Sequence, residues 1–396
     1  MASLRASISP ARLAAFDLLL KVEDGGYASD LLRQVRCDAR DAALASEIVY
    51  GVLRRRAQLD WLIRRLSRRP CESLDRCVLT ALRMGVYQLR HLDRVPAHAA
   101  VNESVELVRR AGKVAAAGLV NAVLRKTGRE PVKWPDRATA LSAPEWMLER
   151  WRHRYGPQTA EAIAAAFLQP PEIFVRAPQG RLEGLQLEPT AVAGCYRVLQ
   201  GRPAPLAMQD IGSQSIVPLL ELAPGVRFLD LCAAPGNKTA QALEAGVRAV
   251  ACDISWKRLA GLKRLGCPLV QLDGTQPLPF SVRFDRILVD APCSGTGTLG
   301  RNPEIKWRVQ PQEFVTQQRR QVRLLAQALQ RLRGGGRLVY ATCSLEREEN
   351  QDVVDEVLRV SEGRFRLLRT AERLPGREAG EGFYAAVITS NEPPND

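Results

Sequence analysis

Two cysteines stand in short segments whose neighbours are small or polar. Cys293 lies in the motif Asp290-Ala-Pro-Cys-Ser-Gly-Thr-Gly297, and Cys343 lies in Ala341-Thr-Cys-Ser344. Carbon 5 of cytosine is a poor nucleophile, and a thiolate that adds to carbon 6 makes carbon 5 electron-rich enough to attack a methyl sulfonium. A base must then remove the carbon 5 proton so that the enzyme is released, and a second thiol could assist that step. The two cysteines therefore predict covalent methyl transfer to a cytosine, but their spacing leaves open which thiol adds.

The surroundings of these cysteines favour chemistry over packing. A lone cysteine at a strand end is more often a small buried apolar side chain. Here each cysteine follows a predicted strand, over residues 286–289 and 337–341. Because strand ends meet at one edge of an α/β sheet, we expect both thiols to project into the same crevice. Asp290 could hydrogen-bond the amino or ring-nitrogen edge of the pyrimidine there and favour addition.

A third motif, Asp230-Leu-Cys-Ala-Ala-Pro-Gly-Asn-Lys-Thr239, is typical of a nucleotide-binding turn. An aliphatic run at residues 226–231 precedes it, and helix-forming residues follow at 239–243, which predicts a strand, a tight turn and a helix. Such a turn places a ligand at the carboxyl end of the strand, against backbone N–H groups that open the helix. An ordinary strand-to-helix turn is the alternative for this motif alone.

Three aspartates follow the next predicted strands and indicate the cofactor. Asp253, Asp273 and Asp290 come after strands at residues 248–252, 268–272 and 286–289, and Asp253 lies 17 residues past Gly236, at a spacing suited to ribose hydroxyls. The G-x-G-x-x-G and Walker patterns are absent, so S-adenosylmethionine, which has ribose and adenine but no phosphate, fits better than a dinucleotide or a triphosphate. Each aspartate alone could be a helix N-cap.

Strands and helices alternate through residues 208–396. This predicts a doubly wound, mainly parallel α/β (Rossmann-like) methyltransferase domain. The other expected elements are a helix that ends at residue 222, a helix at 311–332, a strand at 337–341, and a terminal hairpin of 365–368 with 383–388.

Residues 131–207 are expected to form a linker and a reduced α/β insertion. Prolines and tryptophans punctuate the linker, and a helix near residues 158–167 ends at Pro170-Pro171. Short strands are expected at residues 173–176 and 196–199.

Residues 1–130 are expected to form an all-helical domain, since apolar residues recur there at helical spacing. The whole chain has 57 Lys and Arg against 43 Asp and Glu, a net charge of +14. Residues 1–130 carry 23 basic and 14 acidic residues, hence +9 of that charge. The densest run is Arg54-Arg55-Arg56, Arg64-Arg65 and Arg68-Arg69. A solvated helix face is one explanation, and the charge bias favours RNA phosphate as the neighbour.

Composition also limits the class of protein. Nine cysteines are irregularly spaced, with no zinc-binding pattern and only three histidines, so we expect reduced thiols and no metal. No apolar run reaches the length of a membrane span, and residues 1–10 lack the apolar core of a signal peptide. A soluble, cytoplasmic protein is expected, with its oligomeric state open and a monomer as the default.

The N-terminal part resembles the NusB-like antitermination-factor domain. The resemblance rests on motifs in the family's order across residues 5–128, among them Ala45-Ser-Glu-Ile-Val-Tyr-Gly-Val-Leu53, Leu82-Arg-Met-Gly-Val-Tyr-Gln-Leu89 and Val101-Asn-Glu-Ser-Val-Glu-Leu107. It implies a helical RNA-binding module.

The C-terminal part resembles the bacterial small-subunit ribosomal RNA cytosine-5 methyltransferases of the Sun/Fmu (RsmB) type. The two cysteine motifs, the Asp230–Thr239 motif and Arg301-Asn-Pro-Glu-Ile-Lys-Trp307 match that family nearly letter for letter. The resemblance implies that Cys343 is the nucleophile, that Cys293 is the release thiol, and that the target is a cytosine of 16S rRNA at position 967. It implies a cofactor site formed by Cys232, Ala233, Ala234, Pro235, Gly236, Asn237, Lys238, Asp253, Asp273 and Asp290.

Two departures from the family concern RNA positioning more than chemistry. The segment between Pro171 and Met208 is short, with Arg176-Ala177 where Arg-Val-Asn is common, and Glu381-Gly-Phe383 replaces Asp-Gly-Phe. Other hypotheses are cytosine-5 methylation of another rRNA or tRNA site and a non-catalytic NusB-like assembly factor. A DNA amino-group methyltransferase needs no cysteine and uses a (D/N)-P-P-(Y/F) turn, so DNA is not expected as a partner.

Overall fold

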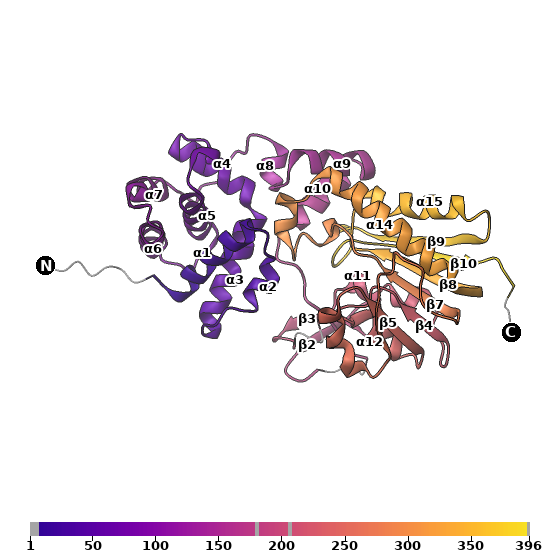
Figure 1. The fold of residues 1–396 in the computed structure, drawn as a ribbon. Coiled ribbons are helices and arrows are strands. Elements are labelled where there is room, and N and C mark those ends of the chain that lie inside the picture. The colour runs from indigo at the N-terminus through magenta and orange to yellow at the C-terminus, as the bar shows by residue number, and fades with distance from the viewer. Residues whose placement is uncertain (1–7, 179–181, 205–207, 394–396) are drawn as a thin grey trace. The chain divides into compact units, whose positions relative to one another are not determined.

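The computed structural model describes residues 8–178, 182–204 and 208–393 (Figure 1). Its chain divides into two compact units, Met1–Pro170 with Leu299–Arg308, and Pro171–Thr298 with Val309–Asp396. The domain boundaries expected at residues 130 and 207 stay predictions. Residues 1–7, most of the segment considered above as a signal peptide, lie outside the described residues.

Within its described residues, the first unit contains helices as its only regular elements, as expected from the helical spacing of its apolar residues. They are α1 (Pro10–Glu23), α2 (Ala28–Leu32), α3 (Ala39–Arg54), α4 (Arg56–Ser67), η1 (Cys71–Ser73), α5 (Arg76–His91), α6 (Ala97–Arg110), η2 (Val114–Ala116), α7 (Ala117–Arg125), α8 (Arg137–Leu141), α9 (Glu145–Tyr155), α10 (Pro157–Ala166) and η7 (Pro303–Trp307).

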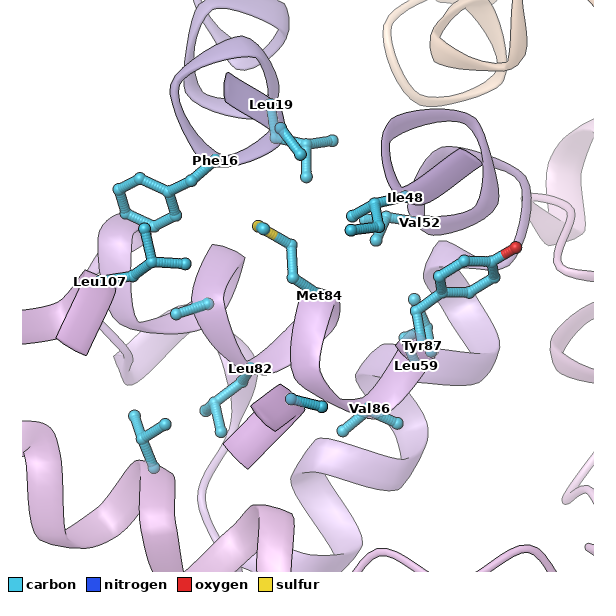
Figure 2. Close-up of a cluster of buried hydrophobic side chains, with 14 of the residues drawn as sticks. Phe16, Leu19, Ile48, Val52, Leu59, Leu82, Met84, Val86, Tyr87 and Leu107 are labelled. Carbon is cyan, nitrogen blue, oxygen red and sulfur yellow. The ribbon is translucent and has the colours of Figure 1, made fainter. Parts of the chain in front are cut away.

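Helix α5 is the centre of this unit. Leu82, Met84 and Val86 are fully buried, and α1, α3, α4, α6 and α7 all contact this helix (Figure 2). Helix α3 approaches closely because Gly51 has no side chain: a Cβ atom there would lie 1.8 Å from the ring of Tyr87. The burial of these apolar side chains is the main source of stability of the helical unit.

The segment Leu299–Arg308 belongs to the helical unit although it lies within the α/β part of the sequence. The ammonium of Lys306 donates to the carbonyl oxygens of Arg54 at 2.9 Å and Ser142 at 2.8 Å. Trp307 Nε1 donates to the Leu53 carbonyl at 2.8 Å. The motif that contains these residues is therefore hydrogen-bonded into the helical unit, which the sequence did not predict.

The second unit is built on a sheet in the order β6-β5-β4-β7-β8-β10-β9. Strands β4 to β8 pair in parallel, and β10 pairs antiparallel with both β8 and β9, which confirms the predicted doubly wound fold and its terminal hairpin. The strands are β4 (Arg227–Asp230), β5 (Arg248–Asp253), β6 (Leu269–Gln271), β7 (Phe284–Asp290), β8 (Leu332–Thr342), β9 (Phe365–Arg373) and β10 (Phe383–Ser390).

Helices cover both faces of this sheet because its central strands are apolar on both sides. Leu229 and Ile287 pack in one buried cluster with α14 and α15, whereas their neighbours Phe228 and Leu288 pack in another with η4 and α12. The helices of this unit are α11 (Ile211–Gln214), η4 (Val217–Leu220), α12 (Asn237–Leu243), α13 (Trp256–Leu259), η5 (Ala260–Leu265), η6 (Thr296–Thr298), α14 (Pro311–Gln330), η8 (Arg347–Glu349) and α15 (Gln351–Val360).

Two segments differ from the expectations. The single helix expected to end at residue 222 is broken into α11 and η4, since Pro218 has no N–H to continue an α-helical ladder. The reduced insertion contains a third strand, giving an antiparallel sheet β1 (Phe174–Arg176), β3 (Cys195–Gln200) and β2 (Gln186–Pro189) in spatial order. No helix of the described residues is both long and apolar enough for a membrane crossing.

Candidate active site

A cavity of about 260 Å³ opens at the carboxyl ends of β4, β5, β7 and β8. The residues expected at the site that line it are Cys232, Ala234, Lys238, Asp253, Asp273, Asp290, Cys293 and Cys343. Lining residues that the sequence analysis missed include Ile254, Arg258, Leu272, Arg320 and Phe383. The parallel strands bring Asp253, Asp290 and Cys343 together because their carboxyl ends share one edge of the sheet.

Four residues of the expected cofactor set are not among the lining residues: Ala233, Pro235, Gly236 and Asn237. The Ala233 N–H donates to the Cys252 carbonyl at 2.8 Å, and the Asn237 side chain donates to the Met208 carbonyl at 3.3 Å. Gly236 has a φ of 104°, and a Cβ there would lie 2.6 Å from the side chain of Leu262. The shape of the turn thus requires glycine at position 236 whether or not a ligand binds there, and the cofactor role of these four residues stays a prediction.

The two thiols are in contact. The Sγ atoms of Cys293 and Cys343 lie 3.3 Å apart, because β7 and β8 are neighbouring parallel strands with Asp290 opposite Ala341. The pKa of Cys293 is well above its ordinary value, first because of the hydrogen bond with Cys343, and also through burial and the nearby Glu349 carboxylate. The raised pKa favours the protonated thiol of Cys293 at neutral pH.

Lys238 places a positive charge beside these thiols. Its Nζ donates to Oδ2 of Asp290 at 2.7 Å and lies 5.4 Å from the centre of the Phe383 ring. Burial alone would lower the pKa of Lys238, but Asp290, together with Cys343 and Asp230, raises it above its ordinary value. The ammonium therefore stays charged in the cavity that the two thiols also line.

Asp253 and Asp273 both have structural partners in addition to their places in the cavity. Asp253 accepts hydrogen bonds from the N–H groups of Ala234 at 3.2 Å and Ser255 at 2.9 Å. Hydrogen bonds from the backbone and hydroxyl of Thr275 lower the pKa of Asp273. Neither aspartate is a helix N-cap, since Ser255 caps α13 and no helix begins directly after Asp273. A carboxylate that stabilises its own loop can still accept hydrogen bonds from a ligand.

The cavity has the chemical character of a nucleoside site. Carboxylates line one part of it, and Ile254, which is 52% exposed, offers an apolar surface beside them. Ribose hydroxyls and a base amino group can donate to carboxylates, while an apolar side chain suits the face of adenine. The residues present therefore fit S-adenosylmethionine.

Asp230 is a further titratable group at this edge of the sheet. It is 1% exposed and accepts a hydrogen bond from the Thr239 hydroxyl at 2.7 Å. Burial raises its pKa to about 7. The motif containing Asp230 was recognised from the sequence, but its burial depends on the packing of the sheet.

Glu349, behind the two cysteine loops, has no counterpart in the sequence analysis. Its Oε1 accepts from the Ser294 N–H at 2.8 Å and from Gln321 Nε2 at 3.2 Å. Its Oε2 accepts from the hydroxyl of Ser294 at 2.5 Å and from that of Ser344. In the sequence, Glu349 lies in a run of charged residues that resembles a solvated helix, so no local signal marks it.

The arginine run of the helical unit contains both buried and exposed side chains. Arg54 is 6% exposed, and its guanidinium donates to the carbonyl of Gly300 at 2.9 Å, so it contributes to packing. The exposed members of the run are Arg64, Arg65, Arg68 and Arg69. These four side chains are the ones available for an anionic partner. In the described part of the chain, no group of three metal-ligating side chains is suitably placed for a metal ion.

Comparisons with known proteins agree with this architecture. A family model described as 16S rRNA methyltransferase RsmB/F matches residues 217–389, and the NusB family model matches residues 9–129. Ribosomal RNA small subunit methyltransferase B of Enterobacter sp. (strain 638) is 35% identical over 419 residues, covering 95% of this chain and 97% of that protein. The protein of the same name from Klebsiella pneumoniae (strain 342) is 34% identical, with the same coverage of 95% and 97%. The crystal structure of PH0851 has the same fold, with a TM-score of 0.79 and 20% identity over 98% of this chain and 100% of that chain.

Proposed function

Because the chain belongs to the ribosomal RNA small subunit methyltransferase B family, we propose that it methylates carbon 5 of a cytosine in 16S rRNA through a covalent cysteine–cytosine adduct. The family membership makes the chain an RNA methyltransferase. Both resemblances seen in the sequence, to NusB-like domains and to Sun/Fmu methyltransferases, are confirmed. The choice of carbon 5, the adduct and position 967 are the parts that we propose.

The observation that carries the proposal is the 3.3 Å contact between the sulfur atoms of Cys293 and Cys343 inside the cavity. Transfer to an amino group or a ribose hydroxyl needs no thiol, whereas carbon 5 needs a nucleophile at carbon 6. A relic sheet in a non-catalytic factor would need neither thiol in the cavity. The paired thiols therefore favour cytosine-5 chemistry over both alternatives.

The two thiols have different roles in this proposal. Cys343, with the Lys238 ammonium nearby, adds to carbon 6 as a thiolate. Cys293 stays protonated through its contact with Cys343 and takes part in the release of the methylated base. Asp290, whose carboxylate accepts from Lys238 at 2.7 Å, would accept a further hydrogen bond from the pyrimidine edge.

S-adenosylmethionine supplies an electrophilic methyl group when it is bound. The residues proposed to hold it are those of the expected set that line the cavity: Cys232, Ala234, Lys238, Asp253, Asp273 and Asp290. The carboxylates would accept from ribose and adenine, and Ile254 would pack on the base. RNA is the proposed partner, and the proposal includes a cytoplasmic, monomeric protein.

Adduct trapping tests both the chemistry and the roles of the thiols. Labelled 16S rRNA is incubated with each variant and the methyl donor, then run on a denaturing gel. Cys293→Ala should methylate once and remain attached to the RNA as a slow-migrating complex, because the adduct forms but does not collapse. Cys343→Ala should give neither methylation nor a complex.

Two other outcomes would change the proposal. If only Cys343→Ala gave the complex, the roles of the thiols would be exchanged. Full activity in both variants would exclude the covalent mechanism. Bisulfite sequencing of total RNA from cells that lack the gene would identify the modified cytosine and separate position 967 from another rRNA or tRNA site.

A further inference from the structure

Glu349 is fully buried and is hydrogen-bonded to the residues that directly follow the two cysteines. Ser294 follows Cys293, and Ser344 follows Cys343. One carboxylate oxygen accepts from both serine hydroxyls, and the other accepts the Ser294 N–H. A single side chain thus links both cysteine-bearing loops.

These loops lie beyond the ends of β7 and β8, where regular pairing between the strands has stopped. A few direct hydrogen bonds still join them, such as that from the Gly297 N–H to the Cys343 carbonyl at 2.9 Å. Glu349 accepts three more hydrogen bonds from the two loops, two from Ser294 and one from Ser344. It therefore adds a side-chain link between the loops to these direct contacts.

Glu349 is itself held firmly in place. Gln321 of α14 donates to its Oε1 at 3.2 Å and to the carbonyl of Pro292 at 2.9 Å. The Tyr340 hydroxyl donates to the Glu349 backbone carbonyl at 2.6 Å. A carboxylate fixed by a helix and by β8 can transmit that rigidity to both loops.

We propose that Glu349 is a positioning residue that links the loops after Cys293 and Cys343, so that the two sulfur atoms stay in contact. Glu349 is not among the residues that line the cavity, so it acts through Ser294 and Ser344. The importance of Glu349 for catalysis rests on the proposed function. Its effect on the contact between the two sulfur atoms concerns the protein alone and can be tested without RNA.

The first experiment measures sulfur contact through disulfide formation in the purified full chain. Diamide takes two electrons from the two thiols, which each lose a proton as the S–S bond forms, and is reduced to the hydrazine. Peptide mapping follows the bond between Cys293 and Cys343. In Glu349→Ala, we expect this bond to form about tenfold more slowly, because the sulfurs must be aligned to react.

The second experiment measures kinetics with RNA in the same variant. We expect kcat to fall about 100-fold, a loss typical of displaced reacting groups, while the KM values for RNA and methyl donor change less than about twofold. Glu349→Gln should recover much of both signals. Its amide oxygen can accept the Ser294 N–H, and its NH₂ can donate to the two hydroxyls once they rotate.

Two further variants provide a control and a replacement test. Glu348→Ala removes the neighbouring carboxylate of the same short helix and should leave the disulfide rate unchanged. If Glu349→Ala does not fold, the double variant Ser294→Ala with Ser344→Ala decides, since it keeps Glu349 with its bonds from the Ser294 N–H and Gln321.

If Glu349→Ala folds, an unchanged rate of disulfide formation in that variant would overturn the inference. If it does not fold, an unchanged rate in the double serine variant would do so. A slower disulfide rate in a protein whose wild-type form does not methylate RNA would keep the geometric role of Glu349 and reject the proposed function. A slower rate with unchanged kcat would show that sulfur contact is irrelevant to turnover and would also overturn the positioning role.

Discussion

The ammonium of Lys238 lies 2.7 Å from the carboxylate of Asp290, although the two residues are 52 positions apart. Lys238 comes from α12, which follows the tight turn after β4, and Asp290 ends β7. The pair therefore joins the proposed cofactor turn to the loop that carries Cys293. Both charged groups lie in the cavity that the two thiols also line.

Replacing Lys238 with Met should slow the chemical step. Loss of the buried ammonium leaves Asp290 as an unpaired negative charge beside the thiols, and a nearby negative charge disfavours the thiolate that must add to carbon 6. We expect kcat and the rate of Cys343 alkylation by iodoacetamide at pH 7.5 each to fall by about tenfold or more. Lys257→Met, an exposed position on α13, is the control for net charge. If Lys238→Met and Lys257→Met were alkylated at equal rates, Lys238 would have no role in the reactivity of Cys343.

Asp253→Ala should weaken binding of S-adenosylmethionine by about 1 to 3 kcal/mol, the cost of leaving ribose hydroxyls without an acceptor. Isothermal titration calorimetry measures the change directly. Asp355→Ala on α15, which is exposed, serves as the matched control. An affinity for S-adenosylmethionine equal to that of the wild type would show that Asp253 does not bind the cofactor.

The buried Lys306 should make the stability of the helical unit depend on pH. Burial, aided by Arg54 and Arg55, lowers its pKa from 10.5 to about 7. Between those two values the unfolded chain binds more protons than the folded one, so stability rises with pH by up to about 1.4 kcal/mol per unit. Below about pH 7 the full cost of burying the charge remains.

Lys306→Met should lose this rise between about pH 7 and 10.5. Urea unfolding followed by tryptophan fluorescence suits the test, because Trp256 is the one tryptophan of the six outside the helical unit, and Trp256→Phe removes its signal. Parallel pH profiles for the two proteins would mean that Lys306 does not titrate in this window.

The exposed arginines of α4 and the turn after it should provide RNA affinity rather than turnover. Replacing Arg64, Arg68 and Arg69 with Gln in the full chain should weaken RNA binding and lower the slope of log K against log salt by about one for each phosphate that the variant no longer neutralises. The double variant Arg109→Gln with Arg110→Gln, on α6, is the control. It tests whether the loss of any exposed positive charge weakens RNA binding to the same extent. An unchanged salt slope would support the solvated-face explanation.

The sequence predicted the parts of the site that depend on strand order. Asp253, Asp290 and Cys343 converge because each directly follows or ends a parallel strand, and strand ends are visible as aliphatic runs. Glu349 and Lys306 were missed for a different reason. Lys306 bonds to Ser142, 164 positions away, and such pairings leave no local pattern in one sequence.

The Asp230–Thr239 motif was predicted correctly as a strand, a turn and a helix, but it was less informative about which atoms face a ligand. The N–H groups of Ala233 and Ala234 bond to Cys252 and Asp253. Whether an amide is free for a ligand depends on the neighbouring strand. A motif indicates the turn, and only the fold shows which donors remain.

The ten residues Leu299–Arg308 have a consequence for how such proteins can be recombined. A chimera that exchanges only the first 170 residues with a relative would place a foreign Lys306 and Trp307 against new carbonyl partners. The helical unit is therefore encoded by two separate parts of the gene, those for residues 1–170 and 299–308. Substitutions in one part should be accompanied by compensating substitutions in the other. Grafting experiments that transfer both pieces together should give soluble hybrids where a single junction fails.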